Sequence, residues 1–93
     1  MIETNDLLAF SFYKKNRFTG SHKNMRYRIQ KTTLEEADYF EVILWKGPYV
    51  LEKSVAQEII SNSFPFEKES LHSIADYLNQ IYLEKKNFWE NEN

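Results

Sequence analysis

The sequence predicts an α+β domain in which an antiparallel sheet of about four strands, connected as a meander, carries one C-terminal amphipathic helix on one face. Apolar residues alternate with period two in several segments before residue 66, and recur at spacings of three and four after it. A length of 93 residues with two glycines and two prolines fits a single domain at 1–93. We expect an ordered core at about 7–86 and a loose tail at 87–93.

The first strand is expected at 7–15, where the alternation places Phe10 and Phe12 on the core face and Tyr13 and Lys15 on the other. Turn-forming Gly20 and Asn24 then predict a loop at 16–24. The second strand begins near residue 25. Its core face would carry Met25, Tyr27 and Ile29, and its opposite face Arg26 and Arg28.

The strongest strand signal is 39–46, which is dense in β-branched and aromatic residues. Its core face would be Phe40, Val42 and Leu44, and its other face Tyr39, Glu41, Ile43 and Trp45. The segment 50–64 fits either a short helix or a strand, and a strand is favoured. From Glu67 to about Lys86 the apolar residues have helical spacing, so this segment is expected to cover the core face of the sheet.

Charge is distributed unevenly along the chain. Residues 1–33 hold seven basic and two acidic residues, a net charge of +5. The remainder holds five basic and twelve acidic residues, a net charge of −7. Such an asymmetry is informative about surface potential and partners rather than about fold.

Because one helix covers only one face of a sheet, the opposite face is expected to be wet or to form an interface. There the sequence places aromatic rings beside cations, a combination that suits single-stranded nucleic acid. We therefore predict a non-catalytic domain that binds single-stranded nucleic acid through this face and the loop 16–24. Phosphates would be held by Lys14, Lys15, Arg17, Lys23, Arg26 and Arg28. Bases would stack on Tyr13, Tyr39 and Trp45.

An alternative remains open, because Ile43 and Trp45 on an outer face also suit a protein interface. The chain would then be a protein-interaction domain. It would act as a homodimer, or as a phage or mobile-element inhibitor of a host protein. In the inhibitor, the acidic C-terminal half of this chain would mimic nucleic acid.

Enzymatic chemistry has little support in the sequence. His22 and His72 lack neighbours at metal-ligand spacing, so no metal site is expected. Two glycines cannot supply a glycine-rich phosphate cradle, and the absence of cysteine excludes a disulfide, a zinc–thiolate site or a thiol nucleophile. We expect no catalytic residues and no cofactor.

Three stretches, "FYKKNRFTGSHKNMRYRI", "LWKGPY" and "FPFEKESLHSIADYLNQIY", resemble a family of short bacterial proteins that often receive a GNAT acetyltransferase label. The resemblance spans roughly residues 8–83 and identifies no known activity, and an acetyltransferase-like protein is the distant alternative that its label implies. GNAT enzymes bind the pyrophosphate of acetyl-CoA with a glycine-rich turn, from which this chain departs. The expected architecture is also similar to coactivator-type domains that bind single-stranded DNA as dimers, a likeness of fold alone.

No apolar run approaches the roughly 20 residues of a membrane helix. Residues 1–10 lack the basic start and long apolar core of a signal peptide. A cytoplasmic protein without membrane contact is therefore expected.

Overall fold

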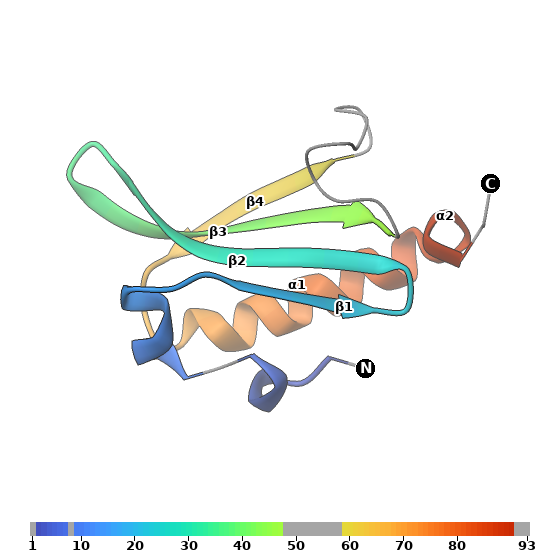
Figure 1. Ribbon diagram of the computed structural model, residues 1–93, viewed down its shortest axis with the longest axis horizontal. Helices are drawn as coiled ribbons and strands as arrows, with labels where there is room; N and C mark the ends of the chain where they lie inside the picture. The colour runs from blue at the N-terminus through green and yellow to red at the C-terminus, as the bar shows by residue number, and fades with distance from the viewer. Residues whose placement is uncertain (1, 8, 48–58, 91–93) are drawn as a thin grey trace.

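The computed structural model describes residues 2–7, 9–47 and 59–90 of the chain. Two short 3₁₀ helices come first, followed by four strands and two helices (Figure 1). In chain order these elements are η1 (Thr4–Asp6), η2 (Phe10–Lys14), β1 (Phe18–His22), β2 (Met25–Leu34), β3 (Ala37–Lys46), β4 (Ile60–Pro65), α1 (Ser70–Glu84) and α2 (Lys86–Glu90).

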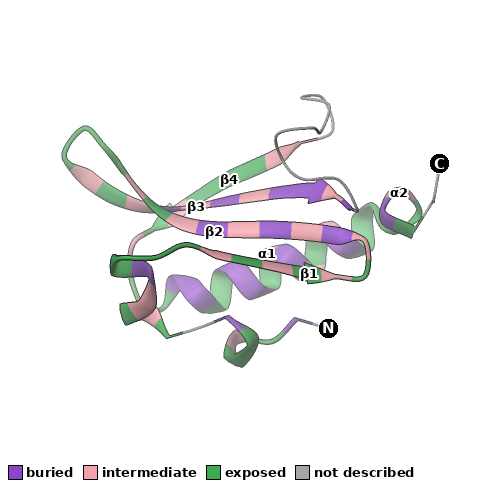
Figure 2. Ribbon diagram, viewed as in Figure 1, coloured by how far each residue is buried: buried purple, intermediate pink, exposed green. Residues whose placement is uncertain are grey.

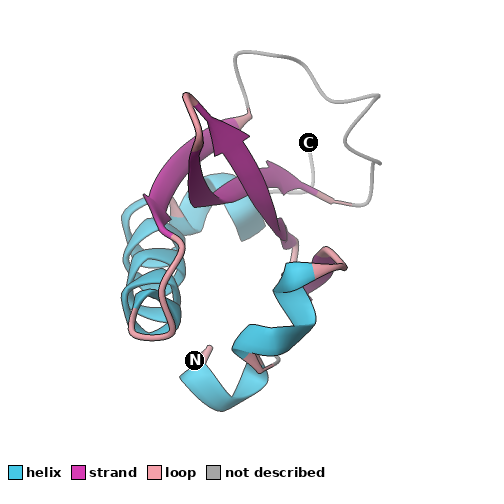
Figure 3. Ribbon diagram, turned by 90° about the vertical axis from the view of Figure 1, so that its left-hand side faces the viewer, coloured by secondary structure: helices cyan, strands magenta, loops and turns pink. Residues whose placement is uncertain are grey.

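The four strands form one sheet in the order β1-β2-β3-β4, and each neighbouring pair is antiparallel. This is the predicted meander. Helix α1 and the N-terminal 3₁₀ turns lie on one side of the sheet (Figure 3). No described helix is both long and apolar enough to cross a membrane. The predicted α+β architecture is confirmed.

The core lies between this face of the sheet and α1, and Figure 2 shows burial alternating along β2 and β3. Met25 and Ile29 of β2 have no exposed surface, and neither do Phe40, Val42 and Leu44 of β3. Helix α1 contributes the buried side chains of Leu71, Ile74, Ala75, Leu78 and Tyr82. The period-two spacing therefore identified the core face of the sheet, and the helical spacing identified the face of α1 that packs against it.

The predicted first strand at 7–15 is wrong, because residues 10–14 form the 3₁₀ helix η2. In a 3₁₀ helix, residues three apart share a face, so Phe10 and Tyr13 both reach the core. Their ring centroids lie 5.9 and 5.4 Å from that of Phe40. Contact with a distant aromatic ring, rather than local alternation, decides the conformation here.

The predicted loop 16–24 is also wrong in its centre, where β1 forms the edge strand of the sheet. Gly20 pairs directly with Tyr27, and a Cβ atom at Gly20 would lie 2.8 Å from the Tyr27 ring. The glycine thus permits a close approach within a strand instead of marking a turn. The turn is at Lys23–Asn24, and Lys23 has a φ of 55°.

The C-terminal part agrees with the prediction except at its end. A strand occupies Ile60–Pro65 as favoured, whereas residues 50–58 of the ambiguous segment lie outside the described residues. The expected loose tail instead begins with α2, whose Trp89 side chain is 0% exposed. An apolar ring of this size gains enough from burial to order the segment that carries it.

The β2–β3 turn places Glu35 and Glu36 at φ values of 51° and 68°, a conformation that costs side-chain-bearing residues roughly 1–2 kcal/mol each. Asn and Gly tolerate these angles, so we expect Glu35→Asn with Glu36→Gly to raise the free energy of unfolding by about 1–2 kcal/mol. Urea denaturation followed by circular dichroism measures the change. The matched control, Glu35→Gln with Glu36→Gln, removes the same charges and keeps the strained angles. Equal stabilisation in the control would show that charge repulsion, and not backbone conformation, was relieved.

Candidate nucleic-acid interface

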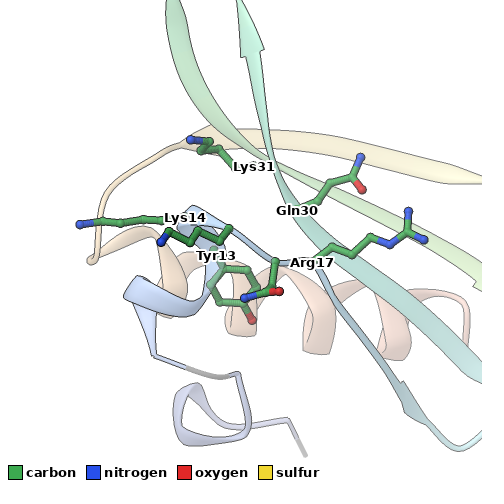
Figure 4. A pocket seen from close by; sticks show the side chains of 7 residues that line it. Tyr13, Lys14, Arg17, Gln30 and Lys31 are labelled. Carbon is green, nitrogen blue, oxygen red and sulfur yellow. The ribbon is translucent and has the colours of Figure 1, made fainter.

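A basic pocket of about 530 Å³ lies where the end of η2 meets β2 (Figure 4). Residues 13–17 form one wall of this pocket and Gln30 and Lys31 of β2 form the other. Its lining is Tyr13, Lys14, Lys15, Asn16, Arg17, Gln30 and Lys31. Four of these seven residues are cationic, and none is acidic.

Two of the lysines rest on core aromatic rings. The Nζ of Lys14 lies 5.7 Å from the Phe10 ring centroid, and the Nζ of Lys31 lies 5.7 Å from that of Phe66. The two rings are themselves 4.6 Å apart, and both contact Phe40. Residues distant in sequence therefore support both ammonium groups on one aromatic platform.

Arg17 and Gln30 flank the other side of the pocket, and Figure 4 shows their side chains extending away from Lys14 and Lys31. Arg17 comes just before β1, whose ladder with β2 begins at the pair Phe18–Ile29. Gln30 Nε2 donates a hydrogen bond of 2.8 Å to the carboxylate of Glu41 on β3. This bond orients the Gln30 amide and places the Glu41 carboxylate beside the pocket lining.

The pocket carries an excess of positive charge. Lys14, Lys15, Arg17 and Lys31 are exposed, and none of them forms an ion pair within the described part of the chain. The four cations repel one another, and although Figure 4 shows Arg17 directed away from Lys14 and Lys31, long exposed side chains of this kind turn readily toward a bound anion, which relieves that repulsion. The arrangement is therefore suited to binding a phosphate or another strong anion.

An arginine row, formed by Arg26 and Arg28, leads toward the basic pocket along the outer face of β2. Residues two apart on a strand are about 6.5–7 Å apart, and Gln30 is the next outer position. The guanidinium carbon of Arg28 lies 5.8 Å from the Trp45 ring centroid, and the Arg26 side chain packs against Gly47.

The arginine row is held in place and has polar neighbours. The Nε atoms of Arg26 and Arg28 are buried without a hydrogen-bond partner among the described residues. On the adjacent strand, the exposed residues Thr19 and Ser21 stand opposite Arg28 and Arg26. Each arginine of β2 therefore has a hydroxyl residue opposite it on β1. Both hydroxyl and guanidinium groups are common phosphate ligands.

The predicted stacking platform differs from the structure. Tyr13 belongs to the core and is 1% exposed, and Trp45 is 3% exposed. Neither ring is open to a base in this arrangement. Tyr39 is half-buried on β3, opposite Thr32, and remains the accessible aromatic residue of the three. Lys23 lies apart from the pocket, at the β1–β2 turn.

The sequence-based prediction named Lys14, Lys15 and Arg17 as phosphate ligands, and all three line the basic pocket. It did not name Gln30 and Lys31, which also line it. Lys31 comes two residues after the core residue Ile29 in β2, and the sequence-based prediction assigned it no role. In the structure it lies past the pairing of β1 with β2 and is exposed. Lys31 is the last basic residue of the positively charged segment 1–33, and this position was the feature of the sequence that could have indicated a role in the site.

Within the described ranges, no group of three or more potential metal ligands is present. Comparison of the chain with models of protein families, with curated proteins and with solved structures gives no match. The expectations drawn from the GNAT-like and coactivator-like resemblances therefore stay predictions, and function is argued from the site alone.

Proposed function

We infer that this chain is a non-catalytic binding domain for single-stranded nucleic acid. The observation that carries the proposal is the basic pocket, where four cations and no acid line about 530 Å³. Binding a phosphate backbone there releases counterions, the main sequence-independent source of affinity for nucleic acid.

The arginine row extends this site into a path. A backbone laid along the outer face of β2 would contact Arg26, Arg28 and then the pocket, with the hydroxyls of Thr19 and Ser21 beside it. Bases would lie over β3, where Tyr39 and Ile43 are half-buried. A flat sheet face suits unpaired bases, whereas reading a duplex generally requires an element that enters a groove.

Fluorescence anisotropy tests the proposal with single-stranded DNA and RNA oligonucleotides of mixed sequence at about 50 and 200 mM salt. With about four to six phosphates contacted, the slope of log affinity against log salt is expected to be about −3 to −4. A duplex of the same length is the control and is expected to bind more weakly. The absence of binding to either single strand at about 50 mM salt would overturn the proposal.

Binding of a protein partner is the alternative that such a negative result would favour. Its anchor in the sequence was Trp45, which is 3% exposed and offers little surface for docking. The mass in solution, measured by light scattering, would then show whether a second copy is the partner.

A further inference from the structure

We propose that the basic pocket holds the terminal phosphate of a strand, a phosphomonoester, while the arginine row holds internal phosphodiesters. This inference rests on the proposed function and specifies which part of the nucleic acid each surface binds. The distinction follows from how much charge each surface carries and from what lies beyond the pocket.

The charge of the pocket exceeds that needed for one internal phosphate. A phosphodiester carries a single negative charge, whereas a phosphomonoester carries about −1.5 to −2 at pH 7 and has an additional acceptor oxygen. The pocket offers four cations, and the neighbouring carboxylate of Glu41, which accepts a hydrogen bond from Gln30, offsets only one of these charges. A doubly charged terminal group relieves the repulsion among these cations more fully than a singly charged link does.

The surface beyond the pocket repels a continuing backbone. After Gln30, the next outer positions of β2 are Thr32 and Leu34, and neither is a cation. The hairpin then turns through the exposed acids Glu35 and Glu36. A strand that follows the arginine row toward the pocket would meet these two carboxylates if it continued along β2. The charge pattern thus ends the phosphate path at the pocket.

The volume of the pocket suits the terminal nucleotide of a strand better than a bare ion. The pocket is open to solvent, and its volume of about 530 Å³ leaves room for a small organic ligand. A terminal nucleotide, with its sugar as well as its phosphate, is a ligand of that class. The amides of Gln30 and Asn16 line the same space and supply polar groups beside the cations.

Three single-stranded DNA oligonucleotides of one sequence test this inference, each with the same internal fluorophore. They carry a 5′-phosphate, a 3′-phosphate or hydroxyl groups at both ends. We expect one phosphorylated form to bind about tenfold more tightly than the unphosphorylated form, since charge-assisted hydrogen bonds are the strong ones. Which end gives the increase establishes the direction in which the strand lies along β2.

Variants assign the effect to the pocket. Arg17→Ala with Lys31→Ala is expected to abolish the tenfold preference, and both residues are exposed, so the fold should be retained. Arg26→Ala is the matched control and is expected to weaken all three oligonucleotides equally. Salt-dependent binding of equal strength to all three oligonucleotides would overturn the terminal-phosphate inference and leave the proposed function standing. If no oligonucleotide binds, both are overturned.

Discussion

Reversing the charge of Lys15 and Arg17 together, as Lys15→Glu with Arg17→Glu, is expected to lower affinity for single-stranded nucleic acid at least about 100-fold at 50 mM salt. Both side chains line the basic pocket and are exposed. Each lost phosphate contact removes about 0.7 from the salt slope, and the new carboxylates repel the backbone as well. Exposed substitutions away from caps and core contacts usually change stability by less than about 0.5 kcal/mol, so circular dichroism should remain unchanged.

The control must change the net charge equally without touching the pocket. Lys85 and Lys86 lie at the junction of α1 and α2, at the opposite end of the molecule from η2 (Figure 1), and both are exposed. Lys85→Glu with Lys86→Glu is expected to weaken binding only a few-fold, through the general field of the protein. Equal losses in both double variants would mean that net charge rather than the pocket determines affinity, and would contradict the proposed site.

The sequence was sufficient for the sheet and the long helix because their faces differ in solvation. In β2 and β3, residues that alternate along the chain are in turn buried and half-exposed, so spacing alone identifies strand and face. The same reasoning fails at η2. Its aromatic residues satisfy alternation equally well, but their partners Phe40 and Phe66 come from distant parts of the chain.

The candidate site was predicted in part for a related reason. Alternation states on which side of a strand a residue lies, but it does not state whether that side is covered. Trp45 lies on the predicted outer face and is nevertheless 3% exposed. Lys31 comes two residues after the predicted core position Ile29 and is nevertheless exposed, with its ammonium 5.7 Å from the Phe66 ring centroid. Coverage depends on which side chains from other parts of the chain lie over a position, as Arg28 lies over the Trp45 ring, and no local pattern encodes this.

Helix α2 is attached to the rest of the molecule by several independent contacts. Trp89 is fully buried, and its Nε1 donates a hydrogen bond of 3.3 Å to the carbonyl oxygen of Ile81. Tyr82 donates a hydrogen bond of 2.7 Å from its hydroxyl to Glu90. This bond raises the pKa of Tyr82 and lowers the pKa of Glu90. The Lys46 ammonium lies 5.2 Å from the Phe88 ring centroid.

Trp89→Ala is therefore expected to lower the free energy of unfolding by about 3–5 kcal/mol, the range for removing a buried aromatic side chain. A domain of this size has a total stability of about 5–15 kcal/mol, so the variant would lose a large fraction of it. Urea denaturation followed by circular dichroism is the appropriate measurement, because tryptophan fluorescence itself changes in this variant. The linear extrapolation gives the difference between the two proteins.

Asn87→Ala is the matched control, since Asn87 lies in the same short helix and is exposed. It is expected to change the free energy of unfolding by less than about 0.5 kcal/mol. If Trp89→Ala were as mild as Asn87→Ala, the segment would contribute nothing to the core, and the loose tail expected from the sequence would be the better description. A large loss confined to Trp89→Ala would show that one buried ring near the end of the chain completes the core. The folded unit would then extend past the end of α1 at residue 84.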